Sequence, residues 1–302
     1  MPERGVLVMS YGTPRSLEEV ASYYTDIRHG RPPPPHLLDE LTARYRAIGG
    51  RSPLYEITRA QAAGIEARTG VRTYVGQKHA PPFIDDAVAS LAAEGVGVCA
   101  GLVLAPHYSA LSVGDYRARV NRAAARIGWA GRLEMIESWH LEEGYLAFLT
   151  GAVEGALLEL AEPARRGAVV LFTAHSLPAG ILERGDPYPE QLRETAAAVA
   201  ARAPLERWDV AWQSAGRTEA PWLGPDVTEV VQDLARRGVG AVVICPCGFV
   251  ADHLEVLYDI DIEARRVADA LGIALVRTRS PNDDPAFLDA LGRVVARALE
   301  VP

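Results

Sequence analysis

The chain has 302 residues, of which 49% are hydrophobic, and its 31 basic and 39 acidic side chains give a net charge of −8. This length allows one large domain or two of about 150 residues each, and the 23% of charged residues argues against disorder. The acidic balance disfavours nucleic acid as a partner, because nucleic-acid-binding proteins usually carry a basic excess.

The sequence also lacks several local signals. No apolar core followed by a cleavage site occurs near the N-terminus and no run of 18 apolar residues occurs, so we expect no signal peptide and no membrane insertion. The three cysteines, Cys99, Cys245 and Cys247, have no disulfide spacing, which favours a reducing, cytoplasmic location. No Walker loop or G-x-G-x-x-G motif is present, so no organic cofactor is predicted.

Eight apolar segments rich in Val, Ile and Leu alternate with longer stretches of helical pattern. They are residues 5–12, 72–78, 98–109, 132–138, 168–178, 209–216, 241–249 and 274–280. Strands separated by helices predict parallel sheets with helices on both faces. The predicted fold class is therefore α/β, with two similar Rossmann-like halves that span residues 1–148 and 149–302.

A cleft between these halves is the expected ligand site, since ligands of open α/β sheets bind beyond the carboxyl ends of the strands. His175 ends one predicted strand, in the segment "TAHSLP". A lone histidine there is more often a hydrogen-bonded core residue, but the sharp strand exit at 176–178 would hold this imidazole at the cleft. Histidine can act in such a place as a metal ligand or as a base near neutral pH.

An acidic row is the second candidate feature. Glu255, Asp259 and Glu263 stand four residues apart in "FVADHLEVLYDIDIEA", which we interpret as a helix that starts at Phe249. Like charges at this spacing share one helix face and repel each other, and a solvated face is the simpler explanation. Against it, apolar residues crowd the row and no Lys or Arg occurs in 249–264. Acids without a basic partner indicate a divalent cation with oxygen ligands.

Residues 28–51 are locally basic in this acidic protein, with five arginines and two acidic residues. The planar fork of arginine suits carboxylates or phosphates. Flat apolar surfaces that could line a pocket come from Tyr11, Tyr23, Tyr24, Tyr45, Tyr55 and Trp222. Together with the His/carboxylate wall, these features imply a flat ligand, apolar in the middle and carboxylated at its edge, that meets a metal ion. A porphyrin fits this description.

Seven segments in the same order make the sequence resemble the ferrochelatase family along nearly its whole length. They are "VLVMSYGTP", "YYTDIRHGR", "RYRAIGGRSPL", "APHYSALSVGDY", "FTAHSLP", "WQSAGRTEAPWLGPD" and "GFVADHLEVLYDIDIEA". The length and the lack of a membrane-binding insertion are similar to the soluble bacterial branch, which inserts ferrous iron into coproporphyrin III. The resemblance implies a chelatase fold, a lyase activity with Fe²⁺ and a porphyrin as substrates, and a place in haem biosynthesis.

The resemblance also implies roles for particular residues. His175 and Glu255 would form the catalytic pair at the ferrous-iron site. Asp259 and Glu263 would continue metal binding outward from Glu255, either feeding iron inward or holding a Mg²⁺ ion. The porphyrin-binding residues would be Tyr11, Arg28, Arg44, Tyr45, Ser52 and Tyr116.

Two features depart from the family pattern. His29 stands where a second arginine is common, so one contact to a propionate would differ. The sequence stops at Pro302 without the cysteine-bearing extension of some relatives, so no [2Fe–2S] cluster is expected.

Other functions stay open at this point. The substrate could be protoporphyrin IX, which would give haem directly. The cleft could also serve a non-catalytic haem or metal carrier with Tyr11 as the haem ligand, although a carrier would not need the acidic row. A chelatase for sirohydrochlorin is disfavoured, because eight carboxylates would require a larger basic surface. We expect a monomer, since closing one cleft needs only one chain.

Overall fold

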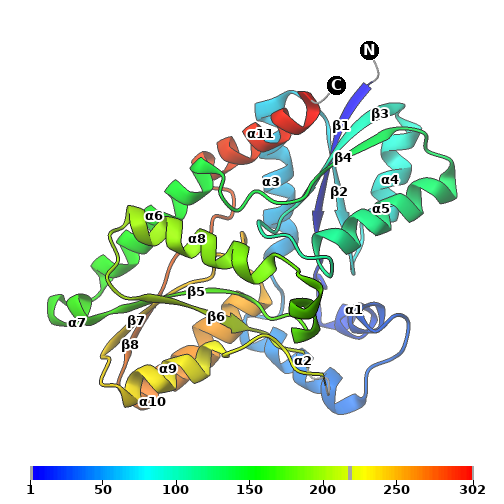
Figure 1. The fold of residues 1–302 in the computed structure, drawn as a ribbon. Coiled ribbons are helices and arrows are strands. Elements are labelled where there is room, and N and C mark those ends of the chain that lie inside the picture. The colour runs from blue at the N-terminus through cyan, green and yellow to red at the C-terminus, as the bar shows by residue number, and fades with distance from the viewer. Residues whose placement is uncertain (1–2, 217–219, 301–302) are drawn as a thin grey trace.

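The computed structural model describes residues 3–216 and 220–300, and it contains two four-stranded parallel sheets (Figure 1). The strand order is β2-β1-β3-β4 in the first sheet and β6-β5-β7-β8 in the second. The strands are β1 (Glu3–Ser10), β2 (Thr73–Gln77), β3 (Val96–Val103), β4 (Arg132–Ile136), β5 (Val169–His175), β6 (Trp208–Gln213), β7 (Ala241–Cys245) and β8 (Ala274–Arg277). The eight predicted strands and the α/β fold of two similar halves are confirmed.

Helices cover both faces of each sheet, as buried parallel strands require. They are α1 (Val20–Ile27), α2 (Pro35–Ala47), α3 (Leu54–Thr69), α4 (Ile84–Ala93), α5 (Val113–Ile127), α6 (Glu143–Glu159), α7 (Glu162–Gly167), α8 (Tyr188–Arg202), α9 (Val227–Arg236), α10 (Arg265–Leu271) and α11 (Pro285–Glu300), with short 3-10 turns at Leu17–Glu19 and Ala179–Arg184. None of these helices, within the ranges that the structure describes, is long and apolar enough to cross a bilayer.

The alternation of side chains along β1 shows why both faces need cover. Val6 and Val8 join a core cluster with residues of α3 and α11, whereas Leu7 and Met9 pack against α4 and α5 on the other face. Successive strand residues point to opposite faces, so an apolar run without polar interruptions fits a strand that is buried on both sides. The cluster around Val6 also contains Val170 of β5, so the two sheets share one continuous core.

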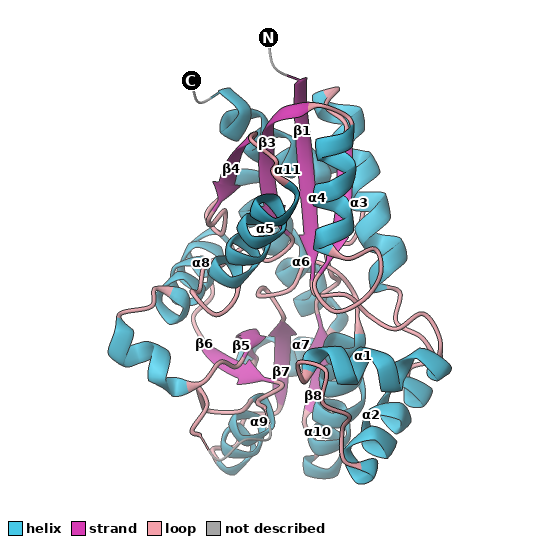
Figure 2. Cartoon of the chain, turned by 90° about the vertical axis from the view of Figure 1, so that its right-hand side faces the viewer, coloured by secondary structure: helices cyan, strands magenta, loops and turns pink. Residues whose placement is uncertain are grey.

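Two parts of the chain cross between the halves. Helices α1 and α2 leave the first sheet and lie beside the second one (Figures 1 and 2), where Arg44 of α2 pairs with Asp259 at 3.3 Å. Helix α11 returns to the first half and packs on α3, with Arg68 Nε 2.5 Å from Asp289 Oδ1. The expected boundary between residues 148 and 149 falls within α6, and it stays a prediction.

The helix predicted to start at Phe249 begins later and has a different form. Residues Glu255–Ala264 form a π-helix, in which hydrogen bonds span five residues instead of four, and α10 follows without a break. The preceding residues are not helical because their backbone groups bond elsewhere. Gly248 N–H donates to Thr173 O at 2.9 Å and Asp252 N–H to the Asn282 side chain at 2.8 Å. The segment therefore arrives at Glu255 as an anchored loop.

Gly248 allows this loop to lie directly on β5. A Cβ atom at this position would come within 2.4 Å of Ala174 Cβ and 2.7 Å of Ala174 Cα. Since backbone cannot move aside cheaply, we predict that Gly248→Ala lowers the free energy of unfolding by about 1–3 kcal/mol. Urea denaturation measures this loss. The matched control is Gly240→Ala, where a Cβ would meet no atom within 4 Å; equal stability of both variants would contradict the close approach.

Candidate active site

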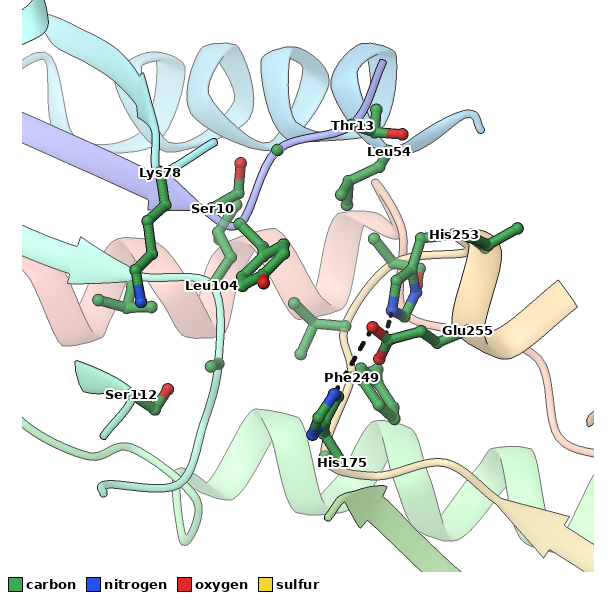
Figure 3. A pocket seen from close by; sticks show the side chains of 18 of the residues that line it. Ser10, Thr13, Leu54, Lys78, Leu104, Ser112, His175, Phe249, His253 and Glu255 are labelled. Carbon is green, nitrogen blue, oxygen red and sulfur yellow. Dashed lines mark hydrogen bonds and ion pairs between the residues drawn. The ribbon is translucent and has the colours of Figure 1, made fainter. Parts of the chain in front are cut away.

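A cavity of about 400 Å³ lies between the two halves (Figure 3). Its size is in the range of small-molecule sites, about 300–1,000 Å³. The lining residues follow the strands directly: Tyr11 comes after β1, Leu104 after β3, and His175 is the last residue of β5. The predicted cleft at the carboxyl ends of the strands is therefore present.

Three titratable side chains form one wall of this cavity. Glu255 lies between two imidazoles, with its Oε1 3.7 Å from His175 Nε2 and its Oε2 3.7 Å from His253 Nε2 (Figure 3). Each imidazole has its Nδ1 beside a backbone carbonyl, that of Ser176 for His175 and that of Ala251 for His253. A carbonyl oxygen only accepts, so each Nδ1 carries the proton. Each Nε2 faces the Glu255 carboxylate and can bind a metal when it carries no proton.

The charge of Glu255 depends on these two neighbours. Burial alone would raise the pKa of its carboxyl, but the nearby His175 and His253 outweigh burial and lower the pKa to about 2. Glu255 is thus a carboxylate at neutral pH although it lies in a largely apolar cavity. A fixed carboxylate next to an imidazole Nε2 is an electrostatic site for a divalent cation.

His253 is the residue of this wall that the sequence analysis missed. On a regular helix, positions 253 and 255 would point to different faces, so the spacing gave no reason to join them. They meet because residues 249–253 form an anchored loop and the π-helix starts only at Glu255. The sequence did contain one signal. His253 stands two residues before a candidate metal-binding carboxylate, in the segment that follows a predicted strand.

The cavity contains four of the six predicted porphyrin-binding residues: Tyr11, Tyr45, Ser52 and Tyr116. Tyr23 and Trp222 add further aromatic surface, whereas Tyr24 and Tyr55 are not among the lining residues. The ring of Tyr55 instead lies 4.2 Å from the Arg15 guanidinium. Fewer of the predicted aromatic residues therefore line the cavity than the sequence suggested.

The other two predicted porphyrin ligands, Arg28 and Arg44, are not among the residues that line the cavity. Arg44 donates to Glu40 and to Asp259, both at 3.3 Å, and its guanidinium stacks 4.9 Å above the Tyr258 ring. Arg28 has a buried Nε with no hydrogen-bond partner in the part of the chain that the structure describes. A role of these two arginines toward a porphyrin stays a prediction.

A lysine that the sequence analysis passed over also lines the cavity. Lys78 follows β2, and its Nζ lies 2.6 Å from Asp115 Oδ2 and 5.3 Å from the centre of the Tyr116 ring. Figure 3 shows this side chain reaching into the cavity from the side opposite His253. A cation next to aromatic faces can hold an anionic group at the rim of a flat ligand.

The acidic row is divided between two cavities. Glu255 faces the main cavity, whereas Asp259 and Glu263 line a neighbouring one together with Arg44, Arg266 and Ser214. The expectation that the row has no basic partner is wrong, because Arg44 is far away in sequence and reaches Asp259 from α2. Ser214 Oγ also donates a short hydrogen bond to Asp259 Oδ2. Within the row, Asp259 is thus paired with Arg44, whereas Glu255 and Glu263 line different cavities.

Asp259 differs from Glu255 in its ionisation. Its side chain is nearly fully buried, and burial together with the charge of Glu255 raises its pKa to about 7, against the opposing effects of Ser214 and Arg44. Glu255 and Asp259, four residues apart, therefore have pKa values below and above the usual range of carboxyl groups. Among residues 3–216 and 220–300, no cluster of three or more His, Cys, Asp or Glu side chains is arranged to hold a metal ion.

Two predicted segments extend beyond the described part of the chain. Residues 217–219 of the motif "WQSAGRTEAPWLGPD" and the terminal Pro302 lie outside it.

The three cysteines are free thiols in buried positions.

Comparisons with known proteins agree with this architecture. A family model described as Ferrochelatase matches residues 3–299. The coproporphyrin III ferrochelatases of Halalkalibacterium halodurans and Geobacillus thermodenitrificans are both 45% identical over 98% of this chain, and the matches cover 97% and 96% of those proteins.

A solved structure supports the fold independently. The sirohydrochlorin chelatase SirB from Bacillus subtilis subspecies spizizenii, in complex with cobalt, matches with a TM-score of 0.62 at 14% identity, covering 99% of this chain and 97% of that one. The shared fold is therefore that of a chelatase of two α/β halves. With the family model and the relatives taken together, the chain belongs to the ferrochelatase family.

Proposed function

We propose that this protein inserts ferrous iron into coproporphyrin III. The observation that carries the proposal is the position of Glu255 between His175 and His253, at the edge of a cavity walled by tyrosines. A metal-binding wall that opens onto flat aromatic surfaces suits a reaction between a cation and a planar ring. The names and the 43–45% identity of the relatives support coproporphyrin III as the ring.

We propose that His175 and Glu255 bind the incoming iron, with His253 beside them. Glu255 supplies a negative charge at neutral pH, because its pKa is about 2. The two Nε2 atoms can supply nitrogen ligands once they carry no proton. A shell of so few protein ligands leaves coordination positions open, and iron that must be handed on to the four nitrogens of a porphyrin needs such open positions.

The reaction also releases two protons from the pyrrole N–H groups. Glu255 is a poor acceptor near neutral pH, since a carboxyl with so low a pKa stays ionised. The imidazole of His175 is the better base. Because one Nε2 lone pair cannot hold iron and a proton together, we propose that His175 binds the metal first and accepts one proton after the metal has moved to the ring. The second proton would pass to His253, whose Nε2 also faces Glu255.

The porphyrin would lie against Tyr11, Tyr45, Ser52 and Tyr116, which already line the cavity. Arg28 would reach a propionate at the rim, since its buried Nε has no hydrogen-bond partner among the described residues. For Arg44 a contact to a propionate would compete with Asp259. Contacts at the rim can supply the binding energy that bends the ring so that nitrogen lone pairs point toward the metal.

The outer carboxylates have a separate proposed role. Asp259 and Glu263 would bind a hydrated divalent ion such as Mg²⁺, or pass iron inward to Glu255. Hard carboxylate and hydroxyl oxygens, as in Asp259, Glu263 and Ser214, suit such ions. We further propose that the protein works as a cytoplasmic monomer, because closing one cleft needs only one chain.

The substrate is tested by anaerobic turnover with ferrous iron, run in parallel on coproporphyrin III and protoporphyrin IX. We expect loss of the free-porphyrin absorbance with coproporphyrin III and a much lower kcat/KM with protoporphyrin IX. A preference for protoporphyrin IX would overturn the substrate but keep the chemistry. Tight haem binding without turnover of either porphyrin would instead indicate a carrier.

His175→Ala should lower kcat by at least about 100-fold, since it removes both the proposed ligand and the proposed base. Porphyrin affinity, measured by fluorescence quenching, should change little, because the aromatic wall is untouched. The control is His36→Ala, an exposed histidine at the start of α2 that does not line the cavity. Near-normal turnover by His175→Ala would exclude the assignment.

The ionisation of Asp259 predicts a pH-dependent stability. A carboxyl whose pKa rises from 3.8 to about 7 on folding favours the folded state at low pH, and this contribution is lost as the pH rises through 7. In buffer with chelator, Asp259→Asn should therefore match the wild type near pH 4 and exceed it above pH 7. The upper limit of the gain is about 4 kcal/mol.

Denaturant melts at several pH values measure this difference, and a difference that does not depend on pH would contradict it. Adding Mg²⁺ above pH 7 should stabilise the wild type but not Asp259→Asn, because only the ionised carboxylate binds the ion. Equal stabilisation of both proteins would exclude Mg²⁺ binding at Asp259.

A further inference from the structure

A set of polar side chains outside the cavity ties down the segment that carries Glu255. Arg277, the last residue of β8, donates from Nε and one terminal nitrogen to the two carboxylate oxygens of Asp261 at 2.7 and 2.9 Å. Its other terminal nitrogen donates to Asp252 Oδ1 at 3.2 Å. Asp252 lies three residues before Glu255 and Asp261 six residues after it, so one guanidinium holds the chain on both sides of the proposed iron ligand.

Asp252 is itself held from several directions. Ser280 Oγ donates to its Oδ1 at 2.7 Å, and the side-chain amide of Asn282 donates to its Oδ2 at 2.9 Å. The backbone N–H of Asp252 donates in turn to Asn282 Oδ1 at 2.8 Å. Asn282 has a positive φ of 46°, a conformation that asparagine tolerates better than most residues. The loop before Glu255 is therefore tied to the segment after β8 by several hydrogen bonds.

The same loop is anchored to the other half of the molecule. Gln61 of α3 is fully buried, and its Nε2 donates to Val250 O at 3.1 Å and to Asn282 O at 2.8 Å. The backbone N–H of Asn282 also donates to Val250 O at 3.0 Å. The loop thus bonds to α3 on one side and, through Asn282 and Arg277, to the end of β8 on the other.

Arg277 is the only cation that these contacts place between Asp252 and Asp261 in the described part of the chain. Its side chain is 15% exposed, and those of the two acids are 24% and 29% exposed. Without the guanidinium, two partly buried carboxylates would face each other with no compensating charge. The loop and the π-helix would then move apart, and Glu255 lies at their junction.

We propose that Arg277 is a positioning residue for the iron site, which keeps Glu255 between His175 and His253 by holding Asp252 and Asp261 together. The proposal rests on the proposed iron insertion, but it concerns residues that do not line the cavity. Residues that orient metal ligands without touching the metal typically change affinity or activity by 10- to 100-fold. A displacement of about 1 Å at a reacting centre has an effect of similar size.

The test is Arg277→Gln, with Arg68→Gln as the matched control. Arg68 also joins an aspartate, Asp289, across two elements, but it lies on α3 away from the cavity. For Arg277→Gln we expect kcat/KM for ferrous iron to fall by about 10- to 100-fold, with KM for the porphyrin within twofold of the wild type. For Arg68→Gln we expect a lower melting temperature without this selective loss.

Amide hydrogen exchange of the metal-free protein provides a readout that does not depend on turnover. Exchange in peptides that cover 249–258 should become faster in Arg277→Gln and stay unchanged in Arg68→Gln. If the wild type lacked chelatase activity, the proposed function would fail, whereas the exchange would still show whether Arg277 orders the loop.

Two results would overturn the proposal. One is a kcat/KM for iron in Arg277→Gln that equals the wild-type value while the protein is folded. The other is unchanged exchange over 249–258. Arg277→Lys separates charge from geometry: an ammonium cannot bond both aspartates as the planar fork does, so we expect an intermediate loss, and full wild-type activity would contradict the need for the fork.

Discussion

The proposed iron site depends on keeping Glu255 ionised in a mostly apolar cavity. Desolvation opposes the charge of Glu255, and the two flanking imidazoles outweigh it. Neither histidine comes from the π-helix: His175 ends β5, and His253 belongs to the loop before the helix. The site therefore forms only when the end of β5, which carries His175, and the loop that carries His253 are held at a fixed separation.

Parallel topology makes this placement possible. The carboxyl ends of four neighbouring strands meet at one edge of each sheet, and the two sheets share a core that turns these edges toward a common cavity. Loops at this edge also bond across the halves. Tyr108 N–H donates to Gln191 Oε1 at 2.7 Å, and Ser109 Oγ donates to Asp186 at 2.9 Å. The cavity wall of the first half is therefore positioned by the second half.

The sequence was informative wherever a local pattern determines the structure. Buried parallel strands appear as uninterrupted apolar runs, so the eight strands, the fold class and His175 at a strand end could be predicted. The π-helix could not, because its register depends on where the anchored loop ends and not on the periodicity of residues 255–264. Arg44 and Asp259 are paired across more than two hundred positions, and such contacts leave no trace in local spacing. His253 was missed because positions 253 and 255 would point to different faces of a regular helix.

Two carboxylates of the acidic row, Asp259 and Glu255, lie in different electrostatic environments. Asp259, with a pKa of about 7, shares its charge with Arg44 and Ser214 in the outer cavity. Glu255, with a pKa of about 2, carries a full charge at the inner cavity. A divalent cation arriving at Asp259 would displace a proton or the arginine, and would then meet a carboxylate that is always ionised. The proposed path from Asp259 to Glu255 would therefore lead a cation from a partly protonated carboxyl to an ionised one.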